Sequence, residues 1–103
     1  MVARIVHDLD RTLHEKSRLA IATALSEHEK LTFIQLRELL SMTDGNLCIH
    51  VRTLERSGYL EKKKRTKNGK AFTECWLSDQ GKSALLGYVN QMEQLINTVK
   101  SRG

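Results

Sequence analysis

The sequence predicts a mainly α-helical domain that carries one β-hairpin and ends in a long C-terminal helix. Three observations support this fold class. Apolar residues recur at helical spacing through residues 15–57. The dipeptide Asn68-Gly69, which suits a two-residue hairpin turn, lies within a strand-like segment. An apolar heptad pattern then fills the C-terminal segment. The chain has 103 residues and no proline, and we expect one domain over residues 1–103.

The composition limits the class of partner. Seventeen Lys and Arg against twelve Asp and Glu give a net charge of +5 and a pI near 9.5, which suits nucleic acid or an acidic membrane surface. The sequence has no apolar run of about 18 residues, the length of a membrane span, and no signal-peptide core at its start. We therefore expect a cytoplasmic protein. Cys48 and Cys75 form no metal-ligand spacing, so we interpret them as reduced thiols and expect neither metal nor cofactor; Cys48 is the better candidate for a redox role.

Residues 1–14 are expected to form an N-terminal helix or arm. Ile5, Leu9 and Leu13 recur every four residues, which indicates a short amphipathic helix that must pack on another element. A clearer helix follows over residues 15–26, and it opens a three-helix core expected over residues 15–57.

The next helix is predicted over Leu31–Leu40. Thr32 and Gln35 fit the capping box, in which each side chain bonds a backbone N–H of the other residue. We expect four apolar side chains of this helix to face inward: Ile34, Leu36, Leu39 and Leu40. Ser41 and Met42 make a short turn, so residues 32–57 have the spacing of a helix-turn-helix, which helical hairpins in unrelated proteins can imitate.

The third helix runs from Thr43, its N-cap, to Gly58, which ends it. Leu47, Val51 and Leu54 share one buried stripe. The opposite face carries two arginines and could enter a nucleic-acid groove, although such a helix alone is also typical of a solvated surface. The residues expected to contact DNA from this helix are Thr43, Asn46, Ile49, His50, Arg52, Thr53 and Arg56.

After Gly58 the pattern changes to a hairpin with arms Leu60–Thr66 and Lys70–Leu77. Its first arm and tip concentrate positive charge, and such a ribbon must stand in solvent. A solubilising hairpin is one interpretation. However, clustered cations repel one another, and a phosphate backbone would supply the missing anion. We therefore predict phosphate contacts from Lys62, Lys63, Lys64, Arg65, Lys67 and Lys70.

The last helix is predicted over residues 78–100, capped by Ser78. Its apolar residues follow a heptad spacing over about two heptads. A domain of this size has little core left for so long a stripe, so we favour a dimer over a helix that folds back on its own domain. Parallel and antiparallel pairing both remain open. The expected interface residues are Ile5, Leu9, Leu85, Val89, Met92, Ile96 and Val99.

Over roughly residues 10–90 the chain resembles small winged helix-turn-helix transcriptional regulators related to the MarR and ArsR families. The match rests on Thr43–Leu47, on the stretch from His50 to Tyr59, and on Leu77-Ser78-x-x-Gly81. The resemblance implies a DNA-binding homodimer, a recognition helix at 43–57 and a wing at 60–77.

This chain departs from the families at two points. Many relatives have a polar residue where Ile49 stands, and an isoleucine can touch a thymine methyl group but cannot donate a hydrogen bond. Base readout would then fall more on Asn46, Arg52 and Thr53. Cys48 alone does not reproduce the cysteine pairs of the ArsR-type metal sensors, so no metal site is carried over.

We therefore predict a homodimeric regulator that binds a palindromic operator, with the recognition helix in the major groove and the wing on the phosphate backbone. The alternative is a winged-helix adaptor that binds protein or RNA. An enzyme is not expected, because the sequence has no glycine-rich phosphate loop, no metal-ligand cluster and no nucleophile with an orienting pair. No residue pattern specifies an effector.

Overall fold

The computed structural model describes residues 2–102, and it confirms a mainly helical fold with a hairpin and a long last helix. Met1 and Gly103, which belong to the predicted domain, lie outside the described residues. The molecule is elongated, with extents of 58 × 25 × 21 Å. The elements in chain order are α1 (Val2–Asp8), α2 (Lys16–Glu27), β1 (Leu31–Thr32), α3 (Phe33–Leu40), α4 (Asp44–Arg56), β2 (Leu60–Lys67), β3 (Lys70–Leu77) and α5 (Asp79–Arg102).

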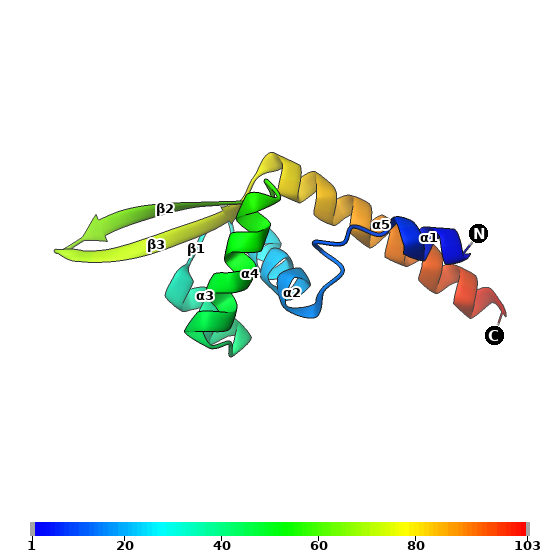
Figure 1. The fold of residues 1–103 in the computed structure, drawn as a ribbon, viewed down its shortest axis with the longest axis horizontal. Coiled ribbons are helices and arrows are strands. Elements are labelled where there is room, and N and C mark those ends of the chain that lie inside the picture. Colours follow the sequence, from blue (N-terminus) through cyan, green and yellow to red (C-terminus); the bar gives the residue numbers. More distant parts are fainter. Residues whose placement is uncertain (1, 103) are drawn as a thin grey trace.

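Three parts follow one another along the long axis (Figure 1). Helices α2, α3 and α4 gather with the base of the sheet into a head. The β2–β3 hairpin leaves the head on one side, and α5 leaves it on the other, with α1 beside the far half of α5. The hairpin therefore lies at one end of the molecule, and α1 and the far half of α5 lie at the other. No helix within residues 2–102 has the length and apolar character needed to cross a membrane.

The sheet is antiparallel with the strand order β1-β3-β2. Asn68 and Gly69 have φ angles of 53° and 78°, the left-handed conformations that the predicted two-residue turn requires. The short strand β1 was not predicted. It consists of two residues, and Leu31 pairs with Cys75 far along the chain. A pairing this short and this distant in sequence leaves no local periodic signal.

One hydrophobic core joins the helices of the head to the base of the hairpin. Leu36, Leu47 and Leu54 are fully buried in it, as are Leu60 and Cys75 at the base of the sheet. The capping box predicted for Thr32 and Gln35 is present, with both N···O distances at 3.0 Å or less.

The predicted burial of α3 is partly wrong. Leu36 is buried and Leu40 is partly buried, as expected for neighbours one turn apart. Ile34 and Leu39, which were also expected to face inward, are both 55% exposed. At 3.6 residues per turn, Leu39 lies about 60° from Leu36, at the edge of the packed face, and Ile34 lies about 160° from it, on the opposite face.

The end of α4 and the start of α5 meet at one joint. Gly58, with φ 82°, ends α4 in a Schellman motif: its N–H bonds the Glu55 carbonyl, and the Tyr59 N–H bonds the Leu54 carbonyl, each at 3.0 Å. Ser78 caps α5 by accepting the Gly81 N–H at 2.9 Å. A Cβ at Gly81 would lie 2.0 Å from the Tyr59 carbonyl oxygen, so only glycine permits this approach.

The N-terminal helix is shorter than the helix predicted from the spacing of its apolar residues. α1 ends at Asp8, and Leu9 and Leu13 lie in the following turn, where both are buried in the head. Asp10 explains the difference, because its carboxylate accepts the Leu13 N–H at 3.0 Å. An Asp side chain that bonds nearby backbone competes with helical hydrogen bonds and favours a turn.

Candidate nucleic-acid interface

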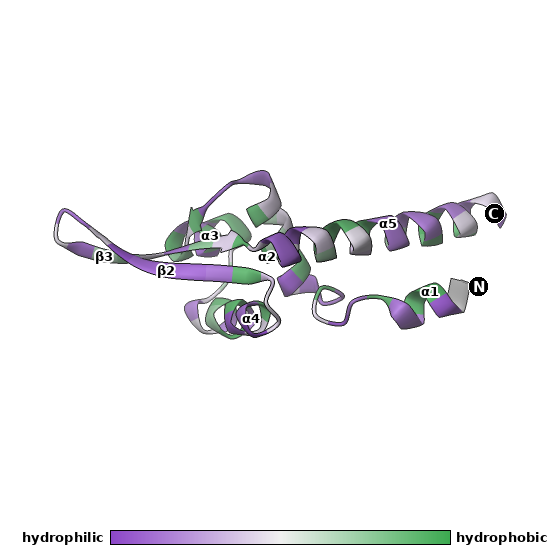
Figure 2. Ribbon diagram, turned by 90° about the horizontal axis from the view of Figure 1, so that it is seen from above, coloured by the Kyte–Doolittle hydropathy of each residue, from purple (hydrophilic) through white to green (hydrophobic). Residues whose placement is uncertain are grey.

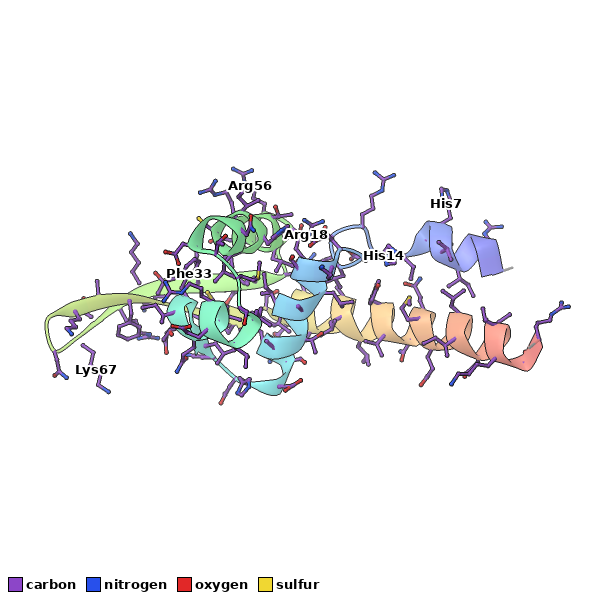
Figure 3. The ribbon with its side chains drawn as sticks, turned by 90° about the horizontal axis from the view of Figure 1, so that it is seen from below. His7, His14, Arg18, Phe33, Arg56 and Lys67 are labelled. Carbon is purple, nitrogen blue, oxygen red and sulfur yellow. The ribbon has the colours of Figure 1, made fainter. Side chains whose placement is uncertain are left out.

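The orientation of α4 is fixed by its buried stripe. Leu47, Val51 and Leu54 are at most 2% exposed, as predicted. Thr43 caps the helix by accepting the Asn46 N–H at 3.1 Å. The remaining face must therefore point away from the head, and Figure 3 shows the labelled Arg56 projecting outward from it.

Most of the residues predicted to contact DNA lie on this outward face. Thr43, Asn46, Arg52 and Arg56 are exposed, and Ile49 is 57% exposed. The Arg52 guanidinium lies 3.7 Å from Cys48 Sγ, one turn before it on the same helix. Arginine and asparagine side chains can each make paired hydrogen bonds to a base edge, and isoleucine can contact a thymine methyl group.

Thr53, which the sequence also predicted to contact DNA, bonds its own helix. Its hydroxyl donates to the Ile49 carbonyl at 3.1 Å, and its side chain is only partly exposed. A threonine that bonds its own helix in this way has used its donor. Asn46, Ile49 and Arg52 therefore remain as the exposed α4 side chains that the sequence predicted for base contacts.

His50 does not share the outward face. Its Nδ1 lies 3.7 Å from Glu15 Oε1 and 3.3 Å from an Arg18 guanidinium nitrogen at the start of α2. The pKa of Glu15 lies below its ordinary value: partial burial opposes this shift, but hydrogen bonds from the Arg18 and Ser17 N–H groups and the nearby charges of His50 and Arg18 outweigh it. The sequence placed His50 among the DNA contacts, whereas the structure turns it toward α2.

A salt bridge that the sequence did not indicate joins the two helices of the helix-turn-helix. Arg37 of α3 donates to the Asp44 carboxylate in the first turn of α4 at 2.8 Å. The bond and charge of Asp44 raise the pKa of Arg37. Asp44 interacts favourably with the positive end of the α4 dipole, and Arg37 offsets the charge of Asp44 there.

The hairpin has two distinct faces. Successive side chains of a strand alternate between faces, so Lys62 and Lys64 lie on the same side as the buried Leu60. This side packs on α4, and we call it the near face. The opposite side, the far face, carries Lys63, Arg65, Lys67, Lys70, Phe72 and Glu74. Figure 2 shows β2 as hydrophilic over most of its length, with a hydrophobic end next to the head.

Two of the six predicted phosphate-binding cations already have acidic partners. Lys62 lies 3.4 Å from a Glu55 carboxylate oxygen on α4, and Arg65 donates to Glu74 across the hairpin. Within the described part of the chain, no carboxylate lies within 4.0 Å of the other four cations, which are Lys63, Lys64, Lys67 and Lys70. These four cations are therefore the ones most available to an external anion.

The residues predicted for a dimer interface divide into three groups by exposure. Leu9 and Leu85 are 7% and 8% exposed, because they belong to the core of the same chain. Ile5 and Met92 are partly exposed. Val89, Ile96 and Val99 are each at least 46% exposed, and they lie along one stripe of α5 together with Leu86. The apolar segments alternate with polar ones along α5 in Figure 2.

The cysteines and histidines do not converge. Cys48 is exposed on α4, and Cys75 is buried beneath the sheet, where burial raises the pKa of its thiol to about 11. Among residues 2–102, no three His, Cys, Asp or Glu side chains gather as a set of metal ligands.

The chain matches a known family over most of its length. The family model described as "Winged helix DNA-binding domain" matches residues 17–96. An uncharacterized protein from Methanocaldococcus jannaschii is 32% identical over 83 residues, which cover 81% of this chain and 90% of that protein.

Solved structures agree with the family match. A transcriptional regulator homologue from Pyrococcus horikoshii is 26% identical, with a TM-score of 0.85 and coverage of 94% of each chain. The YusO protein of Bacillus subtilis is 13% identical and has the same fold, with a TM-score of 0.78 over 98% of this chain and 74% of its own. The predicted resemblance to winged helix-turn-helix regulators is confirmed.

Proposed function

The chain belongs to the winged helix DNA-binding domain family, and from this premise we propose that it is a homodimeric transcriptional regulator that reads a palindromic operator. The observation that carries the proposal is the outward face of α4, where Asn46, Ile49 and Arg52 stand exposed on a helix fixed by its buried stripe. These side chains suit an edge of adenine, a thymine methyl group and guanine respectively.

The wing supports this interface through charge. Its near face adjoins α4, so a duplex that receives α4 in its major groove would meet Lys64 and Lys62 first. Lys64 has no carboxylate partner among residues 2–102, whereas Lys62 forms an ion pair with Glu55. Contacts of this kind fix the register of a protein on DNA and carry no base information.

Dimerisation is supported by the unpaired stripe of α5. Val89 and Ile96 are seven residues apart and nearly half exposed, and Val99 and Leu86 extend the same apolar surface. A second copy of the stripe would remove this area from water, which stabilises association by about 25 cal/mol per Å². A two-fold dimer would present two copies of α4 to half-sites about 34 Å apart, which is one turn of DNA.

Salt dependence gives this proposal a numerical form. If each subunit neutralises about four phosphates, the dimer releases counterions from about eight phosphates. The logarithm of the DNA association constant should then fall with the logarithm of the salt concentration at a slope of about −7. A monomer that uses the same contacts would show half that slope. The slope therefore reports both the phosphate contacts and the number of subunits on the duplex.

The test is fluorescence anisotropy with duplex DNA from upstream of the protein's own gene, compared with a scrambled duplex of equal length across a salt series. We expect a preference of about a thousandfold or more at moderate salt and a footprint with two-fold symmetry. Equal and strongly salt-dependent binding of both duplexes would contradict sequence-specific readout. Absence of binding to either duplex at low salt would overturn the DNA assignment and favour an adaptor role.

A further inference from the structure

The outer edge of β3 is only partly covered. β1 pairs with Cys75 and Glu74 and then ends, because the chain turns into α3 at Phe33. In the described part of the chain, the β3 edge from Lys70 to Thr73 therefore has no neighbouring strand on the β1 side. A strand edge of this kind presents backbone N–H and C=O groups that can pair with another strand.

A groove of about 650 Å³ lies beside this open edge. It runs from the start of α3 to the tip of the hairpin, and its β3 and β2 side chains belong to the far face. Figure 3 shows Lys67 at the tip pointing to the side opposite Arg56 of α4. The lining residues are Lys30, Thr32, Gln35, Lys67, Asn68, Lys70, Phe72 and Glu74.

The charge of the groove is positive. It contains three lysines and one carboxylate, and that carboxylate, Glu74, accepts a hydrogen bond from Arg65. Lys30 lies 4.9 Å from the centre of the Trp76 ring, which holds its ammonium group on this side of the sheet. Phe72 adds an apolar side chain to the lining of the groove.

We propose that this groove binds an acidic, extended segment of a partner protein, which adds as a strand to the Lys70–Thr73 edge of β3 beside β1. The open edge favours a peptide over nucleic acid, because a strand edge offers donors and acceptors in alternation and a peptide backbone supplies both. A phosphodiester backbone supplies acceptors only. Acidic side chains on alternate residues of the segment would face Lys67 and Lys70.

This site is independent of the outward face of α4. The far face lies on the other side of the hairpin from α4, so a peptide can occupy the groove while a duplex contacts α4 and the near face. The protein would then hold DNA and an acidic partner at the same time. The inference does not require the operator to be palindromic or the protein to be dimeric.

The probe is a fluorescein-labelled peptide of alternating glutamate and valine, titrated with the full chain at low salt and followed by anisotropy. We expect the double variant Lys67→Glu/Lys70→Glu to bind it roughly tenfold or more weakly, since two exposed ion pairs become repulsive. Lys64→Glu on the near face is the matched control, and it should weaken duplex DNA binding while it leaves peptide binding within about twofold.

Two further measurements separate strand addition from simple charge attraction. A peptide in which prolines replace the valines keeps every carboxylate but loses alternate N–H donors, and we expect it not to bind. Amide hydrogen exchange should slow at Ala71 and Thr73, whose N–H groups face the open edge, in the presence of the original peptide. Equal binding of the proline peptide, or unchanged exchange at these residues, would overturn the proposal.

Competition with DNA completes the test. Peptide affinity should be unchanged when the protein is saturated with its duplex. If the duplex displaces the peptide, or if the Lys67→Glu/Lys70→Glu variant loses DNA affinity to the same extent as Lys64→Glu, the far face is a DNA backbone surface and the proposal is wrong. Failure of peptide binding with intact DNA binding would overturn this inference and leave the regulator proposal standing.

Discussion

Helices α4 and α5 have the same kind of sequence but different surroundings. Both place apolar residues three and four apart, so each helix has one apolar face. The apolar stripe of α4 is buried by its own chain. The stripe of α5 is buried only near its start, at Leu85 and Tyr88, whereas Ile96 and Val99 are 46% and 60% exposed.

The contrast shows that periodicity defines a face but does not say what covers it. α4 lies between α2 and the sheet, so its apolar face has neighbours on the same chain. α5 has 24 residues and extends about 36 Å at 1.5 Å per residue, so its far half leaves the head with only α1 beside it in Figure 1. The apolar face of α4 is covered by the head, whereas the apolar face of α5 stays exposed at Val89, Ile96 and Val99.

The largest predicted effect is a loss of folding stability when a buried residue of α4 is shortened. Leu54→Ala removes a fully buried side chain and should lower the free energy of unfolding by about 2–5 kcal/mol, because it creates a cavity in a packed core. Urea denaturation followed by circular dichroism measures the change. Ile49→Ala, on the outward face of the same helix, is the control and should stay within about 0.5 kcal/mol of the wild type. Similar losses in both variants would contradict the division of α4 into a core face and a free face.

The second effect tests the stripe of α5. Ile96→Asp would place an unpaired carboxylate at the centre of the proposed dimer contact, which costs about 3 kcal/mol or more when buried. We expect the dimer dissociation constant to rise at least a hundredfold in sedimentation equilibrium, with the fold of each subunit retained.

Asn90→Asp introduces the same charge at an exposed position on a different side of α5. It should leave the dissociation constant within about threefold, as surface substitutions usually do. An unchanged constant for Ile96→Asp would remove this stripe from the dimer contact.

The third effect separates the outward face of α4 from the near face of the wing. Arg52→Ala should cost about 1–3 kcal/mol on the operator and relax the preference at one base pair. Lys64→Ala should weaken operator and scrambled duplexes alike and reduce the magnitude of the salt slope by about 1. Binding to a set of single-base operator variants distinguishes the two. A uniform loss for Arg52→Ala would reassign this residue to the backbone.

Features set by neighbours in sequence could be predicted. The caps at Thr32 and Thr43, the helix end at Gly58 and the Asn68-Gly69 turn each depend on residues within one turn, and the structure confirms all four. The fold class followed from these signals and from the resemblance to a known family.

Features set by distant pairings could not be predicted. The Arg37–Asp44 bridge, the turn of His50 toward Glu15 and the strand pairing of Leu31 depend on how the helices pack. The same holds for the hairpin. The sequence shows six cations, but it does not show which of them already form ion pairs with acidic side chains. The amphipathic pattern therefore predicted a candidate face, and only packing could show which of its residues point outward.

The smallest effect concerns the joint between α4 and α5. Tyr59 follows α4, its carbonyl meets Gly81 of α5, and its hydroxyl donates to Asp10 at 2.5 Å. This hydrogen bond, with partial burial, raises the pKa of Tyr59 from 10.0 to about 12. Because the folded-state pKa is the higher one, the stabilisation is complete below pH 10 and is lost as pH rises toward 12.

Tyr59→Phe should therefore lower the free energy of unfolding by about 1 kcal/mol at neutral pH, the usual worth of a hydrogen bond. The difference from the wild type should shrink as pH rises above 10. Both proteins retain an alkaline loss from Cys75, whose pKa is raised from 9.0 to about 11 by burial, so the comparison must be made between the two proteins at each pH. Urea titrations across that range measure it. A difference that stays constant with pH would mean that Tyr59 stabilises the joint by packing, and that the loop after α1 does not hold the two helices through Asp10.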